Sequence, residues 1–179
     1  MHAGARSIVL IGMMGAGKSS VGRCLQTHTG LQCFDMDELI VAQSGLSIAE
    51  MFAQKGEQWF RNLETSVLTE LRLNEPAIVV TGGGVVLRPG NVDTLKRLGT
   101  VIWLEADAET LLERASRRGN RPLLQTENPA VTLSEMLEAR RPLYAAAADI
   151  RVDTTRRNHD DVADVILSEV EKRQAAGAS

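Results

Sequence analysis

The segment with the clearest chemistry lies near the amino terminus, where residues 12–19 read GMMGAGKS. It matches the pattern GxxxxGK followed by Ser or Thr, in which glycines let successive backbone N–H groups converge on phosphate oxygens. An apolar run precedes it and a helical pattern follows, so a helix dipole adds to the attraction. In this pattern the lysine, Lys18, reaches the β- and γ-phosphates, and the hydroxyl of Ser19 binds Mg²⁺. The segment therefore predicts a P-loop protein that binds ATP or GTP with Mg²⁺.

The rest of the chain narrows the class of P-loop protein. The sequence contains no NKxD tetrad, with which a GTPase would recognise guanine. Motor and AAA-type ATPases are usually larger than this chain of 179 residues. The economical interpretation is a kinase that phosphorylates a small molecule or a nucleotide.

Length, composition and charge exclude several other classes. The chain has 179 residues, 44% hydrophobic and 24% charged, as in an ordinary globular protein, and we expect one domain over residues 1–179. A formal net charge of −3 and an aromatic content of 3% argue against nucleic-acid binding. The amino-terminal apolar run is too short for a secretion signal, and no run reaches the ~18 residues of a membrane span. We therefore expect a cytoplasmic protein with no nucleic-acid or membrane partner. A monomer is our separate working expectation.

Two aspartates, Asp35 and Asp37, follow a short expected strand at residues 32–35. If the strand continued, alternation would put both carboxylates on one face. One could then serve the water shell of the metal and the other a substrate hydroxyl. The alternative is a solvated turn, or Asp37 as the cap of the helix that follows. The later strand at residues 77–81 carries no acid at its end, where a Walker B aspartate would lie, and this favours Asp35 for the metal.

Three consecutive glycines, Gly82, Gly83 and Gly84, follow the strand at residues 77–81. Such a run is costly in backbone entropy. At the carboxyl end of a parallel strand it favours close approach of a ligand to the backbone. The alternative is a plain turn.

Several arginines could bind phosphate or carboxylate groups. Arg61 lies alone in a predicted helix, where an arginine is usually solvated. A cluster lies in and beside residues 117–129, which lack apolar periodicity and are predicted to be a loop: Arg114, Arg117, Arg118 and Arg121. In a P-loop enzyme such a segment suggests a lid whose arginine stabilises the transferring phosphoryl group, although a solvated loop is the alternative. The pairs at residues 140–141 and 156–157 are ambiguous by themselves.

The elements that must position these residues alternate along the chain. Strands are expected at residues 7–11, 32–35, 77–81, 100–104 and 150–152. Helices are expected at residues 18–29, 57–74, 89–98, 107–116, 133–148 and 160–172, and a frayed tail follows the last of them. A further helix should begin at the capping box of Ser47. The helix at 57–74 should turn one face to the core, made by Trp59, Leu63, Val67 and Leu71. This alternation predicts an α/β fold of three layers, α/β/α, with a parallel sheet of about five strands.

Taken together, the motifs resemble the shikimate kinase family, of the nucleoside-monophosphate-kinase-like group of P-loop proteins. The matching stretches follow in order over nearly the whole chain: GMMGAGKSSVGR, FDMD, SIAEMFAQKGEQWFR, VVTGGG, RPLL, ARRPLY and VDTTRRN. The resemblance implies a five-stranded sheet of order 2-3-1-4-5, a helical substrate-binding insert at about residues 36–64 and a lid at about 114–129. It also implies transfer of the γ-phosphoryl group of MgATP to the 3-hydroxyl of shikimate, within aromatic amino-acid biosynthesis.

The resemblance further implies a role for each motif residue. The residues implied to bind ATP are Gly15, Ala16, Gly17, Lys18, Ser19, Ser20, Arg114, Arg121 and Arg157. The residues implied to bind shikimate are Asp37, Arg61, Gly82, Gly83, Gly84 and Arg140. Ser19 and, through water, Asp35 would hold Mg²⁺, and the catalytic residues would be Lys18, Asp37 and Arg121. The alternatives are a sister kinase such as gluconate kinase, and a nucleotide-binding module that has lost catalysis.

Overall fold

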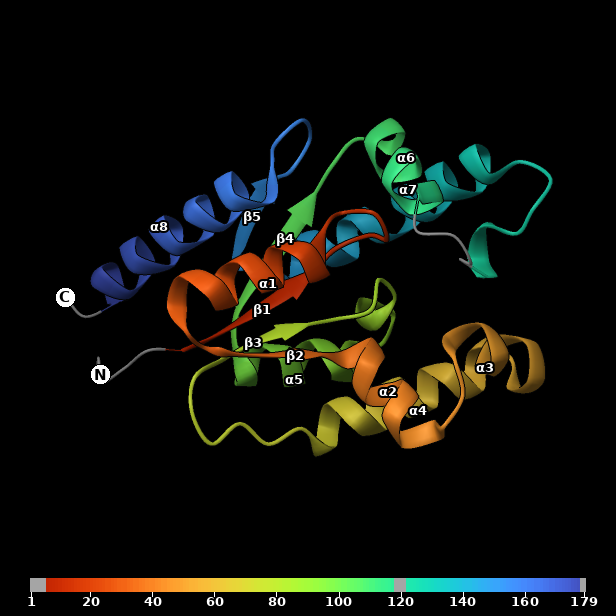
Figure 1. The fold of residues 1–179 in the computed structure, drawn as a ribbon, viewed down its shortest axis with the longest axis horizontal. Helices are drawn as coiled ribbons and strands as arrows, with labels where there is room; N and C mark the ends of the chain where they lie inside the picture. Colours follow the sequence, from red (N-terminus) through yellow and green to blue (C-terminus); the bar gives the residue numbers. More distant parts are fainter. Residues whose placement is uncertain (1–5, 118–121, 178–179) are drawn as a thin grey trace.

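The computed structural model describes residues 6–117 and 122–177, and its central element is a five-stranded sheet of order β2-β3-β1-β4-β5 (Figure 1). All neighbouring strands run parallel. The strands are β1 (Ser7–Ile11), β2 (Gln32–Asp35), β3 (Ala77–Val80), β4 (Gly99–Glu105) and β5 (Ile150–Asp153). The predicted fold class and strand order are therefore confirmed.

Helices cover both faces of the sheet. Along the chain they are α1 (Lys18–Thr29), α2 (Met36–Ser44), α3 (Ile48–Lys55), α4 (Glu57–Glu70), α5 (Pro89–Leu98), α6 (Ala108–Arg117), α7 (Pro129–Ala147) and α8 (His159–Gly177), with short 3₁₀ helices η1 (Val85–Leu87) and η2 (Pro122–Leu124). Helices α1 and α8 pack together on one face, and α5 and α7 lie on the other (Figure 1). No helix of the described residues is long and apolar enough to cross a bilayer.

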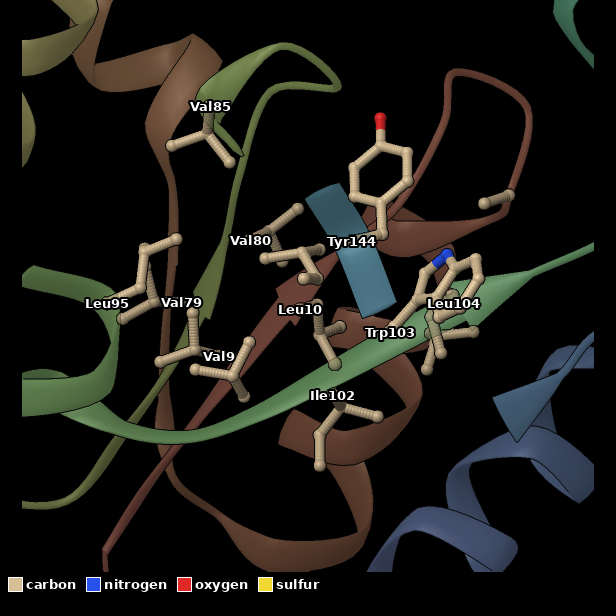
Figure 2. Close-up of a cluster of buried hydrophobic side chains, with 14 of the residues drawn as sticks. Val9, Leu10, Val79, Val80, Val85, Leu95, Ile102, Trp103, Leu104 and Tyr144 are labelled. Carbon is tan, nitrogen blue, oxygen red and sulfur yellow. The ribbon is translucent and has the colours of Figure 1, made fainter. Parts of the chain in front are cut away.

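The core lies around the three central strands. Every residue of β1, β3 and β4 is buried, which explains why these strands read as continuous apolar runs rather than alternating ones. Figure 2 shows side chains of these strands, among them Leu10, Val79 and Ile102, packed against one another. Because the strands are parallel, the segments that follow β1, β2 and β3 leave the sheet at one edge, and this edge carries the candidate site.

Three predicted helix boundaries are wrong. Helix α4 ends at Glu70 rather than at about residue 74, because its C-cap, Leu71, already has a non-helical ψ of 121°. Helix α7 starts at Pro129 rather than residue 133, because the side chain of Asn128 accepts a hydrogen bond from the Val131 N–H and proline suits the first turn. Helix α8 continues to Gly177 instead of fraying after residue 172, since alanine-rich sequence favours helix.

The predicted apolar face of α4 is also wrong in part. Val67 is buried, but Trp59 is 37% exposed to solvent. The residues of α4 that the structure buries are Phe60, Arg61, Glu64, Val67 and Leu68. Arg61 and Glu64 thus occupy buried positions that apolar periodicity alone would assign to solvent. They are buried because this helix borders a cavity, which is described below.

Candidate active site

The phosphate loop connects β1 to α1 and takes backbone conformations that need glycine. Gly12, Gly15 and Gly17 have φ angles of 142°, 83° and 90°. A Cβ atom on Gly12 would lie 2.3 Å from the carbonyl oxygen of Leu104, and one on Gly15 would lie 2.3 Å from that of Leu111. The loop is therefore packed against the backbone of β4 and α6, which keeps its N–H groups converging on one point.

Lys18 begins α1 and is turned back over the phosphate loop. Its Nζ donates hydrogen bonds to the carbonyl oxygens of Gly12 and Met13, at 2.7 and 3.0 Å, and only 9% of the residue is exposed. These bonds hold its positive charge at the mouth of the loop. This is the position that the motif predicts for a charge that meets phosphate.

Asp35 ends β2 and faces the start of α1. Its Oδ2 accepts a hydrogen bond from Ser19 Oγ at 2.8 Å, and its Oδ1 accepts one from the Asp37 N–H at 3.0 Å. Asp35 is thus the N-cap of α2, so the strand does not continue and Asp37 lies in the first helical turn. The expectation of two acids on one extended face is wrong, and so is the alternative in which Asp37 is the cap.

The Ser19–Asp35 pair fits a partial Mg²⁺ site. Mg²⁺ typically takes one or two protein oxygens and completes its shell with waters and substrate phosphates. Within residues 6–117 and 122–177, no three His, Cys, Asp or Glu side chains converge as a ready-made metal site. A hydroxyl and a carboxylate 2.8 Å apart beside the phosphate loop are instead suited to an ion that arrives with a nucleotide.

A cleft of about 290 Å³ runs along the phosphate loop. Its lining includes Gly15, Gly17, Lys18, Ser19, Ser20, Asp37, Gly82, Gly83, Arg114, Arg117, Arg157 and His159. Arg114 is held in place by Thr154, whose hydroxyl and carbonyl oxygens accept hydrogen bonds from its guanidinium at 3.2 and 2.9 Å. Ala16, within the loop, is buried. Arg121 lies outside the described residues.

A smaller cavity of about 70 Å³ adjoins the cleft and shares Met14, Asp37, Gly82 and Gly83 with it. One wall is apolar and consists of Ile48, Phe52, Phe60, Pro122 and Leu123. The other carries Asp37, Arg61, Glu64, Arg140 and the three glycines of residues 82–84. Two cations and two acids in a half-apolar cavity are suited to a small molecule that has both a carboxylate and hydroxyl groups.

Arg61 is buried in this wall, so the expectation that a lone helical arginine is solvated is wrong. Only 7% of it is exposed, and its Nη1 donates to Glu64 Oε2 at 2.9 Å. Glu57 accepts two further bonds from the same guanidinium. Burial raises the pKa of Glu64 and the charge of Arg61 opposes that rise. Among the described residues, Glu64 Oε1 has no hydrogen-bond partner, which leaves an acceptor in the cavity wall.

The three glycines make room for other parts of the site. A Cβ on Gly84 would lie 2.3 Å from Arg61 Cζ, and one on Gly82 would lie 2.7 Å from Glu64 Oε1. A Cβ on Gly83 would lie 3.3 Å from the Met14 backbone nitrogen in the phosphate loop. The backbone of this turn is therefore approached closely by the side chains of Arg61 and Glu64, while close approach of a ligand stays a prediction.

Sequence reasoning missed two buried residues of this wall. Glu64 lies three residues after Arg61, a spacing that places both on one helical face and could have suggested the ion pair. Tyr144 lies one helical turn after Arg140 and donates its hydroxyl hydrogen to the Gly83 carbonyl oxygen. Nothing in the local sequence indicates this second contact, because its partners are far apart in the chain.

Tyr144 is the only tyrosine in the sequence, so its ionisation can be followed by itself. Burial raises its pKa from 10.0 to about 12, against the opposing charge of Arg140. We expect absorbance titration to show the phenol ionising well above pH 10. Because only the unfolded chain ionises near its ordinary pKa, the stabilisation from Tyr144 should be complete below pH 10 and should fall as pH rises toward 12. A midpoint near 10 in the folded protein would contradict this.

The fold and the two adjoining cavities define a small P-loop phosphotransferase with separate places for a nucleotide and a small anionic acceptor. The family model described as "Shikimate kinase" matches residues 14–171. A shikimate kinase of Symbiobacterium thermophilum is 42% identical over 173 residues, which are 96% of this chain and 99% of that protein. The chain belongs to the shikimate kinase family.

Solved structures agree with this assignment. The structure of a shikimate kinase from Acinetobacter baumannii in complex with shikimate has a TM-score of 0.91 and 38% identity, and covers 95% of each chain. A gluconokinase from Sinorhizobium meliloti has a TM-score of 0.60 and 18% identity, over 98% of this chain and 97% of that one. The second likeness extends to the fold alone.

Proposed function

We propose that this protein transfers the γ-phosphoryl group of ATP to the 3-hydroxyl of shikimate, which yields ADP and shikimate 3-phosphate. The observation that carries the proposal is the cavity beside the phosphate cleft, where Arg61 and Arg140 lie buried near Asp37. Two guanidinium groups suit one carboxylate. With the carboxylate bound there, a hydroxyl on the far side of a small ring can face the cleft, because Asp37 lines both spaces.

The shape of the cavity favours a ring over an open chain. Its apolar wall, formed in part by Phe52 and Phe60, offers a surface against which one face of a carbocycle can pack. An open-chain polyol such as gluconate would place hydroxyl groups against that wall, and their lost hydration would not be replaced by hydrogen bonds. This disfavours the gluconate kinase alternative.

Each side chain then has a proposed part in the reaction. Asp37 accepts a hydrogen bond from the attacking hydroxyl and takes its proton, while Lys18 and the loop N–H groups neutralise the phosphates. Arg114 and Arg157, which line the cleft, would flank the base. Ser19 and, through water, Asp35 would hold Mg²⁺, which when bound neutralises phosphate charge. Arg121 would reach the phosphates from the lid.

We also propose an organisation for the whole chain. Residues 1–179 form one domain, in which residues 36–64 bind the acceptor and residues 114–129 are the lid. Pro122 and Leu123 of η2 support the assignment of the lid, because they line the acceptor cavity although they belong to the connection between α6 and α7. We propose that the protein acts as a cytoplasmic monomer.

The proposal is tested by measuring ADP release under saturating MgATP with shikimate, quinate, gluconate or no acceptor. We expect turnover with shikimate to exceed that with the other acids, and ADP release without acceptor to be small. Equal or faster turnover with gluconate would reassign the acceptor. ATP binding without ADP release for any acceptor would indicate a nucleotide-binding module.

Removal of one acceptor arginine should weaken acceptor binding most. Arg140→Ala or Arg61→Ala leaves a partly buried carboxylate without a charged partner worth about 1.5–3 kcal/mol, so the Kd for shikimate should rise roughly 10–150-fold. Arg141→Ala is the matched control, because its side chain is 49% exposed and pairs with Glu105 instead. Wild type should bind the carboxamide of shikimate much more weakly than the acid. Equal acid-to-amide discrimination by wild type and variants would mean that these arginines do not hold the carboxylate.

A further inference from the structure

The hydroxyl of Tyr144 reaches the turn between the two cavities. Tyr144 is fully buried, and its ring stacks on Trp103 with ring centroids 5.9 Å apart. Figure 2 shows the ring beside Trp103 with the hydroxyl directed away from the packed strand side chains. That hydroxyl donates to the carbonyl oxygen of Gly83. A core side chain therefore ends in a polar contact with a glycine that lines both the phosphate cleft and the acceptor cavity.

The same carbonyl oxygen also accepts a hydrogen bond from Arg140. The distance from Arg140 Nη1 to Gly83 O is 3.3 Å. A guanidinium has five N–H donors in a rigid plane, so the direction of one bond decides where the others point. If Tyr144 did not satisfy the carbonyl, Arg140 would be the remaining side-chain donor among the described residues that contacts it. With that 3.3 Å bond as its remaining side-chain partner, the carbonyl oxygen would draw the guanidinium toward the turn and away from the cavity.

We propose that Tyr144 is a positioning residue for the acceptor site. Its hydroxyl holds the Gly83 carbonyl, which keeps the glycine turn in place and leaves Arg140 free to present its other N–H groups to the acceptor carboxylate. This inference rests on the proposed function, in which Arg140 holds the carboxylate of shikimate. No part of it requires Tyr144 to touch a substrate.

The proposal predicts an effect on one substrate rather than on both. The phosphate loop is closed by its own bonds, such as those from Lys18 Nζ to Gly12 O and from the Ala16 N–H to Met13 O. Within the described residues, the hydrogen bond that Tyr144 makes to this loop is to the sulfur of Met13, at 3.8 Å. Loss of the hydroxyl should therefore leave ATP binding nearly unchanged.

The first test compares Tyr144→Phe with Trp103→Phe. We expect Tyr144→Phe to raise the KM for shikimate about 5–10-fold and to leave the KM for ATP within about twofold. Trp103→Phe loosens the same stack without touching Gly83, so it should lower Tm and leave the KM for shikimate within about twofold. If Tyr144→Phe leaves the KM for shikimate unchanged, or if both variants raise both KM values in step with their loss of Tm, the proposal is overturned.

The second test asks whether Tyr144 acts through Arg140. In an Arg140→Ala background, the effect of Tyr144→Phe on the KM for shikimate should shrink below about twofold, because no guanidinium remains to be displaced. An undiminished effect in that background would overturn the proposed route.

A third test uses two other variants at position 144, so that the proposal can still be tested if Tyr144→Phe does not fold. 4-Aminophenylalanine and 4-methylphenylalanine at position 144 have similar volumes, but only the first can donate a hydrogen bond. The amino variant should keep a KM for shikimate within about twofold of wild type, and the methyl variant should not; equal KM values would overturn the proposal. Wild-type turnover of shikimate is measured first. Its absence would refute the proposed function, whereas a normal wild type with an unaffected Tyr144→Phe would refute the positioning role alone.

Discussion

Replacement of Asp37 by asparagine is expected to lower kcat by about 10²–10⁴-fold while ATP binding stays nearly intact. Asp37 lies in the first turn of α2 and lines both cavities, so its carboxylate is placed between the acceptor and the phosphates. Asparagine keeps the size of the side chain but cannot take a proton from the attacking hydroxyl. The measurement is kcat with shikimate, alongside equilibrium binding of ATP.

The control for Asp37→Asn is Glu38→Gln. Glu38 is the next residue in the same helical turn and is exposed, so its replacement removes an equal charge from the helix start. We expect this control to keep kcat within about twofold of wild type. A near-normal kcat for Asp37→Asn would show that the carboxylate serves the structure of α2 and not the reaction.

Replacement of Arg121 by alanine is expected to lower kcat by about 10³–10⁵-fold, the range known for arginines that meet a transferring phosphoryl group. Arg121 lies outside the described residues. The expectation follows from its place before Pro122 in the RPLL motif, since Pro122 and Leu123 line the acceptor cavity. Charge that develops on the transferring oxygens counts for more in a site from which water is excluded. The effect should therefore fall on kcat and not on either Kd.

Arg121→Lys tests whether the planar guanidinium matters. Lysine restores the charge but not the two-pronged geometry, so it should recover only part of the lost kcat. The measurements are kcat and the equilibrium Kd values of ATP and shikimate for both variants. The alternative is that the alanine variant keeps its kcat, and that its affinity for ATP falls by the same factor as its kcat/KM. Arg121 would then be a ground-state contact of the nucleotide.

The boundaries of the elements were predicted less well than their order. The start of α2 directly after Asp35 was missed because the motif FDMD suits a strand and a helix cap equally well, and the hydrogen bond from the Asp37 N–H to Asp35 Oδ1 settles the choice. The end of α8 was missed because an alanine-rich tail was interpreted as frayed although its residues favour helix. Both errors arise where two local patterns compete.

The sequence by itself determined the presence of a parallel sheet of about five strands and the phosphate loop. These depend on local patterns: continuous apolar runs for buried strands, and fixed glycines before Lys18 for a loop that binds phosphate. Only the tertiary structure decided that Arg61 is buried against Gly84 and that Tyr144 holds Gly83. The physical reason is that burial and hydrogen bonding of these groups depend on residues brought together across the fold. Helical periodicity reports which residues share a face, but not whether that face meets solvent, the core or a cavity lined with charge.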